Sequence, residues 1–179
     1  MSQPCYIIDV EGLDALLQAL RDAGYQTLGP RLGDGGIEYG GIECAADLPR
    51  GWTERQSPGR YRVERRDDDR YFGFTVPGMS WKTFLHPPRL TLMHVTLDAN
   101  GLRFVDADTS TPRYAFIGVR PCELAAIEVQ DKVFVDGLYT DTHYRRRRDA
   151  AFVVGVQCGV AAPTCFCTSM GTGPRADAG

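Results

Sequence analysis

The chain has 179 residues, of which 43% are hydrophobic, and a formal net charge of -3. This composition is typical of a folded globular protein, and the charge excludes the strongly basic class of nucleic-acid-binding proteins. No apolar run approaches the roughly 20 residues of a membrane-spanning helix, and the amino terminus lacks the pattern of a secretion signal. We therefore expect a cytoplasmic protein without a membrane span or a nucleic-acid partner.

The amino-terminal segment is predicted to hold one amphipathic helix. Residues 5–10 are predicted as a short strand, and Asp9 or Glu11 then begins a helix that Gly24 ends. The spacing of three and four residues between its leucines is typical of a single buried helix face. These leucines are Leu13, Leu16, Leu17 and Leu20.

Turn-forming sequences and alternating strands follow. Gly29-Pro30 and residues 33–36 are predicted as turns, because glycine supplies positive backbone angles and proline fixes its own. The alternation of residues 60–65 and 71–76 predicts an antiparallel hairpin around the polar turn 66–70. This half of the chain is therefore predicted to be rich in sheet.

A short helix and a second hairpin are predicted next. Ser80 caps the helix 80–85, which the sequence His86-Pro87-Pro88 stops. Residues 90–97 and 102–105 then alternate as two strands around a hairpin turn.

The character changes after residue 113. An apolar strand 114–119, a helix after Pro121 and an apolar strand 152–156 form a strand-helix-strand unit, which is typical of parallel strands. We therefore predict an α+β fold, with antiparallel hairpins in the first half and this unit in the second half. We assign residues 1–174 to a single cysteine-rich domain. Residues 175–179 are a tail or the boundary of a longer chain.

Six cysteines in a chain without a secretion signal favour metal ligands or reactive thiols over disulfides. Cys5 and Cys44 are isolated, and we expect them to be structural, because free cysteine is often a small buried hydrophobe. The other four follow the two apolar strands of the second half. Since parallel strands end at one edge of a sheet, their exit loops should meet there. The predicted site contains Cys122, Cys158, Cys165 and Cys167.

Four thiolates are the usual ligands of a 2Fe-2S or a 4Fe-4S cluster, and thiolate also binds zinc. Hydroxyls from Thr164, Thr168 and Ser169 are expected to donate hydrogen bonds to cluster sulfurs. Cys122 is expected at the start of a helix, where the dipole favours a thiolate, with Arg120 adding positive charge. The cysteine spacing matches neither the bacterial ferredoxin run nor a pair of zinc knuckles.

Signs of catalysis are missing from the sequence. We find no serine, histidine and acid arrangement and no flavin, nicotinamide or ATP motif. No residue is assigned a catalytic role, so a non-catalytic electron-transfer subunit is favoured over an enzyme. The basic run Arg145 to Arg148 is expected to be a solvated helix end, with docking of an acidic partner as the alternative.

Two cysteine-bearing segments, residues 118–126 (GVRPCELAA) and 164–174 (TCFCTSMGTGP), carry a resemblance. With the segments 48–52, 59–62 and 80–85, they make the sequence similar to the amino-terminal region of the 4Fe-4S dicluster proteins. This family is related to the beta subunit of cytoplasmic nickel-iron hydrogenase (sulfhydrogenase) and to one of the subunits of anaerobic sulfite reductase.

The resemblance implies a domain that relays electrons between a flavin-bearing subunit and a catalytic subunit. It favours 4Fe-4S over 2Fe-2S. Family members continue into a carboxyl-terminal ferredoxin-like module with two cluster motifs, and this chain lacks that module. The main alternative is a structural zinc-binding or metal-free scaffold domain that docks partner subunits. A thiol-disulfide enzyme using Cys165 and Cys167 is less favoured, because a Cys-x-Cys pair makes a strained ring.

Overall fold

The computed structural model describes residues 6–76, 78–99, 101–107 and 111–176. Its helices are α1 (Val10–Asp22), η1 (Ala45–Asp47, a 3-10 helix), α2 (Lys82–Leu85), α3 (Pro121–Phe134) and α4 (Thr142–Asp149). Its strands are β1 (Gln26–Gly33), β2 (Gly36–Gly41), β3 (Trp52–Ser57), β4 (Arg60–Arg65), β5 (Met93–Asp98), β6 (Gly101–Asp106), β7 (Tyr114–Val119) and β8 (Phe152–Gly155). The predicted α+β class is confirmed.

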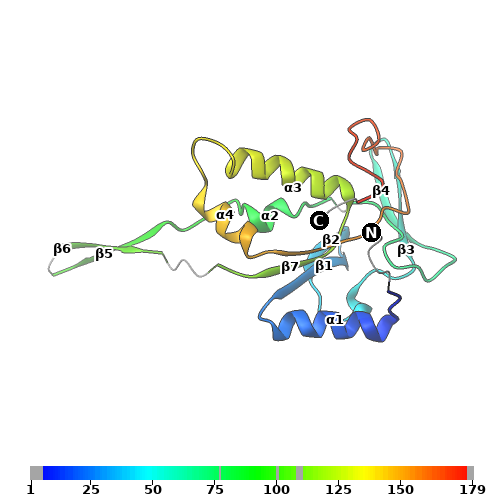
Figure 1. Cartoon of the computed structure of the whole chain (residues 1–179), viewed down its shortest axis with the longest axis horizontal. Coiled ribbons are helices and arrows are strands. Elements are labelled where there is room, and N and C mark those ends of the chain that lie inside the picture. The colour runs from blue at the N-terminus through cyan, green and yellow to red at the C-terminus, as the bar shows by residue number, and fades with distance from the viewer. Residues whose placement is uncertain (1–5, 77, 100, 108–110, 177–179) are drawn as a thin grey trace.

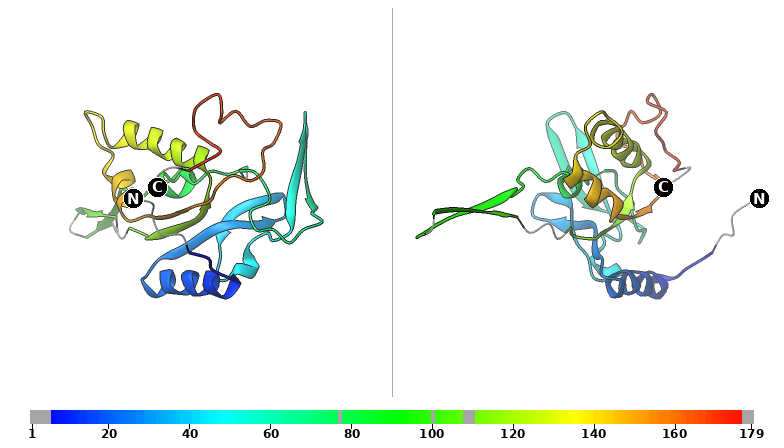
Figure 2. Two further views of the ribbon diagram at one scale, coloured as in Figure 1. Left: turned by 45° about the vertical axis from the view of Figure 1, so that its right-hand side comes forward. Right: turned by 60° about the vertical axis from the view of Figure 1, so that its left-hand side comes forward.

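A four-stranded mixed sheet forms the centre, in the order β2-β1-β7-β8. β1 pairs antiparallel with β2 and parallel with β7, and β7 pairs parallel with β8. Helix α1 lies on one side of this sheet and α3 on the other (Figure 1). The β3–β4 and β5–β6 hairpins are separate two-stranded sheets at opposite ends of the molecule (Figures 1 and 2).

Strand β7 is buried on both faces, which explains its continuous apolar sequence. Phe116 packs among the residues on the side of α2, α3 and α4, which include Trp81 and Ile127. Ala115 and Ile117 pack on the other side, against Leu17 of α1 and its neighbours. The strand therefore joins two hydrophobic clusters into one core.

A bulge at Gly118 changes this alternation just before the strand ends. The pairing of β7 with β8 shifts between Ile117 and Val119, and Gly118 has a φ of +89°. As a result Val119 packs on the same side as Phe116. A Cβ atom at Gly118 would lie 2.5 Å from Cε1 of Phe72, so both the backbone angle and the space require glycine here.

The predicted hairpin of residues 60–65 and 71–76 is wrong. β4 pairs with β3 instead, across the turn that contains Gly59, whose φ is +69°. Residues 71–76 form no strand. Two of their backbone carbonyls, those of Phe72 and Phe74, accept hydrogen bonds from the Arg120 side chain rather than from a neighbouring strand.

Two predictions in the first quarter are also corrected. Residues 6–9 form no strand, and Asp9 caps α1 by accepting a 2.8 Å hydrogen bond from the Gly12 amide. Cys5 lies outside the described residues. Gly29-Pro30 is not a turn but part of β1. The parallel ladder to β7 ends at Leu28, so the missing proline amide interrupts no bond on that side.

The later elements follow the predictions closely. β5 and β6 form the second hairpin, and α2 is preceded by Ser80, whose hydroxyl accepts a hydrogen bond from the Lys82 amide. In α4, Arg145 pairs with Asp149 and Arg148 with Asp131, so half of the basic run is engaged within the chain.

Within the described ranges, no helix has both the length and the apolar composition that crossing a membrane requires.

Replacing Gly118 with alanine should lower the free energy of unfolding by about 2 kcal/mol, since alanine is strained at this φ and meets Phe72. Urea denaturation followed by circular dichroism measures this. Gly41→Ala is the control, because Gly41 has open space and no positive φ, and it should change stability by less than about 0.5 kcal/mol. Equal effects of the two substitutions would contradict the role of the bulge.

Candidate metal centre

The four predicted cysteines line one cavity of about 620 Å³. Cys122, Cys158 and Cys167 are half-buried, and Cys165 is exposed. The remaining wall is mainly apolar and comes from α3, from the β3–β4 region and from the carboxyl-terminal loop. It includes Tyr61, Val76, Ala125, Ala126, Val129, Phe166 and Met170.

The parallel pairing of β7 and β8 brings the first two cysteines to this edge. Cys122 is the second residue of α3, directly after β7, and Cys158 follows β8. Because the two strands are parallel neighbours, their carboxyl ends lie at the same edge of the sheet. This juxtaposition is the one that the sequence predicted.

Residues 158–174, here called the cysteine loop, bring the other two. The loop is closed at its base, where the Cys158 amide donates a 3.2 Å hydrogen bond to the Pro174 carbonyl. It stands beside the start of α3 and the β3–β4 hairpin (Figure 2). The Thr164 hydroxyl donates to the Gln56 side chain of β3 over 2.8 Å, which fastens the outer part of the loop.

Close packing holds the returning limb of the loop against α3. A Cβ atom at Gly173 would lie 3.4 Å from Sγ of Cys167 and 3.6 Å from Cβ of Pro121. The Thr172 amide also donates to the Cys167 carbonyl over 2.9 Å. Cys167 is thereby fixed next to the helix that carries Cys122.

Arg120 connects three segments around the cavity. Its side chain is buried, with 2% of the residue exposed, and donates to the carbonyls of Phe72 and Phe74 over 2.8 Å each. It donates further to the carbonyl of Gln157, the neighbour of Cys158, over 3.1 Å. The planar guanidinium suits several acceptors held at fixed positions.

Glu123 completes the start of α3. Its carboxylate accepts a 3.0 Å hydrogen bond from the Arg120 amide and a 2.6 Å bond from the Tyr39 hydroxyl. Burial raises the pKa of Glu123, against these hydrogen bonds, which lower it. Burial and the neighbouring Glu123 raise the pKa of Tyr39, which keeps its hydroxyl a donor.

The expected electrostatics of Cys122 are corrected. Arg120 is engaged with backbone carbonyls and is not among the groups that shift this thiol. Burial raises the pKa of Cys122, and Glu123, Cys167 and Cys158 raise it further. Desolvation and like charges therefore outweigh the helix amino terminus in the metal-free protein.

The sulfur atoms have backbone partners rather than the expected hydroxyl partners. Sγ of Cys165 accepts from the Ala162 amide over 3.2 Å, and Sγ of Cys158 donates to the Val160 carbonyl over 3.1 Å. The Thr164 hydroxyl is directed to Gln56 instead.

The donor set fits a cluster better than it fits one ion. Among the described residues, no three Cys, His, Asp or Glu side chains are grouped closely enough to hold a single metal ion. A single zinc ion requires every sulfur within about 2.3 Å of one point. A cluster distributes its thiolate ligands over several iron atoms around a larger centre. Four thiols around a cavity, with an amide already directed at one sulfur, match the second requirement.

Sequence reasoning missed the contribution of β3 and β4 to this cavity. Gln56 and Tyr61 line it, as do Thr75 and Val76. The Thr75 amide and hydroxyl both donate to the Glu54 carboxylate, which ties the irregular segment to β3. The wrong pairing partner for residues 60–65 hid this wall, and no local motif marks it.

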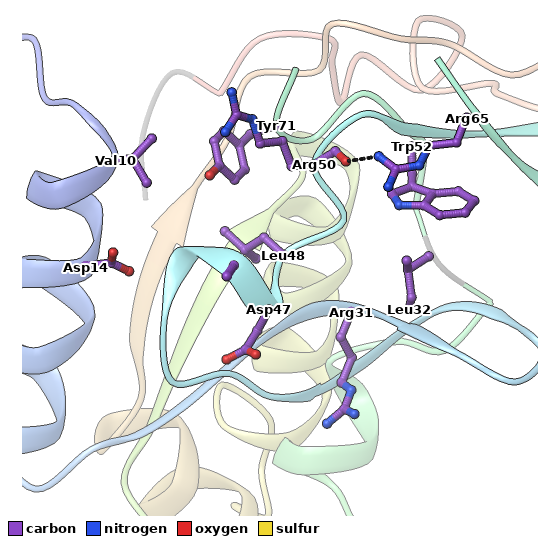
Figure 3. Close-up of a pocket in the computed structure, with 11 residues that line it drawn as sticks. Val10, Asp14, Arg31, Leu32, Asp47, Leu48, Arg50, Trp52, Arg65 and Tyr71 are labelled. Atoms are coloured by element: carbon purple, nitrogen blue, oxygen red, sulfur yellow. Dashed lines mark hydrogen bonds between the residues drawn. The ribbon is translucent and has the colours of Figure 1, made fainter. Parts of the chain in front are cut away.

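A second hollow of about 610 Å³ lies between α1, η1 and β3 (Figure 3). Asp14 and Asp47 there accept hydrogen bonds from backbone amides at η1. Arg65 donates to the Arg50 carbonyl and lies over the ring of Trp52. Its charged groups thus serve the protein's own structure, and no cysteine lines it.

Comparison with known proteins gives one distant relationship. Over 122 residues, which are 68% of this chain, the sequence is 30% identical to subunit beta of sulfhydrogenase 2 from Pyrococcus furiosus. The chain is similar to a hydrogenase subunit. The alignment spans only 34% of that relative, about a third of its length. No family model matches the chain, and no solved structure matches it. The similarity supports a loose relationship with hydrogenase beta subunits.

Replacing Arg120 with methionine should lower the free energy of unfolding by about 3 kcal/mol, because three carbonyls lose their donor and a buried charge is removed. Arg55→Met is the matched control, since Arg55 pairs with Glu64 on the surface and should contribute at most about 0.5 kcal/mol. Urea denaturation of both variants measures the difference. A loss of less than about 1 kcal/mol at Arg120 would contradict its role.

The raised pKa of Cys122 predicts slow alkylation in the metal-free folded protein, because only the thiolate reacts. The rate of iodoacetamide labelling at Cys122 should rise with pH along a curve whose midpoint lies above that of the same cysteine in the urea-unfolded chain. Mass spectrometry of the peptide that contains Cys122 gives both midpoints. A lower midpoint in the folded protein would show that the helix dipole outweighs burial.

Proposed function

We propose that this chain is an iron-sulfur electron-transfer domain of a hydrogenase- or sulfite-reductase-type redox complex. Its cluster ligands are Cys122, Cys158, Cys165 and Cys167. The observation that carries the proposal is that these four thiols, from two neighbouring strand ends and one closed loop, line a single cavity. The similarity to a hydrogenase beta subunit supports the same class of function.

The residues of this chain would hold the cluster and set its surroundings. A bound cluster supplies reversible uptake of an electron, and no acid or base is required for it. The half-buried cysteines keep part of the site from water, and the Ala162 amide donates to a ligand sulfur. Hydrogen bonds to sulfur raise the reduction potential of such centres, and burial also tunes it. We favour a 4Fe-4S centre over a 2Fe-2S centre.

The partners follow from the same proposal. We propose that the domain relays electrons between a flavin-bearing subunit and a catalytic subunit in the cytoplasm. We further propose that a ferredoxin-like module belongs to the complete protein, since the alignment covers only a third of the related hydrogenase subunit.

Anaerobic purification should give a brown protein with about four iron and four acid-labile sulfide per chain. Cys122→Ala should lose most of both, because it removes one of four ligands. Cys44→Ala is the matched control, since Cys44 is also half-buried but lies outside the cavity, and it should retain full content. Iron, sulfide and zinc analysis with the visible spectrum measures these outcomes.

Other results would redirect the assignment. About two iron and two sulfide per chain would indicate a 2Fe-2S centre. About one zinc, or a colourless protein without metal, would replace the proposal with a scaffold domain that docks partner subunits. Intact cluster content in Cys122→Ala would remove Cys122 from the ligand set.

A further inference from the structure

The β5–β6 hairpin extends away from the rest of the molecule (Figures 1 and 2). Its two strands pair with each other over six residue pairs and join no other sheet. A two-stranded hairpin in water is marginally stable at best, because it has nothing against which to bury a face.

The register of the hairpin separates apolar from polar side chains. Opposite residues in an antiparallel pair lie on the same face, and neighbours along a strand lie on opposite faces. Val95 is opposite Phe104, and Leu97 is opposite Leu102. One face therefore carries Met93, Val95, Leu97, Leu102 and Phe104. The other face carries His94, Thr96 and Arg103.

This apolar face is uncovered. Leu97 is 78% exposed and Phe104 is 66% exposed, and the other three are also exposed. A strictly one-sided apolar strip is the pattern of a strand pair whose face packs on something. In the described part of the chain no helix or sheet covers this face, and exposed contiguous apolar surface of this kind marks an interaction site.

We infer that the apolar face of the β5–β6 hairpin packs against the same face of a second copy of this chain, forming a two-fold symmetric dimer. Two such hairpins would stack face to face at about 10 Å, the usual separation of packed sheets, with their side chains interdigitated.

A second copy suits this face for three reasons. The five side chains of the face carry no charge, so two copies meet without burying an unpaired charge. The strip is a neutral row of similar side chains, and a two-fold dimer requires such a self-complementary patch. The polar side chains of the opposite face remain in water. The inference does not rest on the cluster.

The size of the face sets the strength of the association. Two six-residue strands cover about 20 Å by about 10 Å, far less than the surface in a permanent dimer. We therefore expect a reversible dimer whose population rises with protein concentration.

Sedimentation velocity of the full chain over a range of concentrations tests the inference. The wild-type protein should shift from monomer to dimer. Val95→Lys, on the apolar face, should raise the dissociation constant at least about a hundredfold, because both copies would bury an ammonium group. His94→Lys is the matched control: the adjacent residue gains the same charge on the polar face, and its dissociation constant should stay within about threefold of wild type.

A shortened variant guards against misfolding of the hairpin. Met93 and Asp106 are paired, so a short Gly-Ser linker can replace residues 93–106. This variant should be monomeric, with the thermal unfolding of the central sheet unchanged. A wild-type chain that stays monomeric at every concentration, that forms large aggregates, or whose dimer survives Val95→Lys would overturn the inference. Equal weakening by His94→Lys would overturn it too.

Discussion

The guanidinium of Arg120 is the interaction on which the candidate site depends. It satisfies carbonyls from an irregular segment at Phe72 and Phe74 and from the exit of β8 at Gln157. These segments have no common sheet or helix to hold them together. A buried cation that bonds to carbonyls instead of a carboxylate is strongly bound to one geometry, since any displacement leaves a charge and several acceptors unsatisfied. The edge of the sheet is fixed by a side chain as much as by strands.

The predictable part of the fold is the part with unambiguous local patterns. β7 and β8 are apolar runs separated by a helix, and this order indicates parallel strands whether or not the tertiary structure is known. The meeting of Cys122 and Cys158 follows from it. That they share a cavity with Cys165 and Cys167 was therefore within reach of the sequence. Metal binding and the single domain of residues 1–174 stay predictions.

The wrong predictions have particular physical causes. Residues 60–65 and 71–76 alternate equally well, and alternation alone does not identify a pairing partner. A buried arginine decided the matter, because Arg120 accommodates the 72–74 backbone that a strand would otherwise have paired. Gly29-Pro30 has the composition of a turn, but proline is tolerated in a strand where the neighbouring ladder has ended. Both outcomes depend on contacts between distant segments.

The closure of the cysteine loop at its base has a consequence for its dynamics. The bond between the Cys158 amide and the Pro174 carbonyl makes the loop a unit that can open and close by itself. Much of the loop is exposed, whereas β7 beneath it is fully packed. Amide hydrogens in the loop should therefore exchange with solvent through local opening, at a much smaller free energy than that of global unfolding. Access to the cysteines would then be controlled by the loop, while the sheet stays folded.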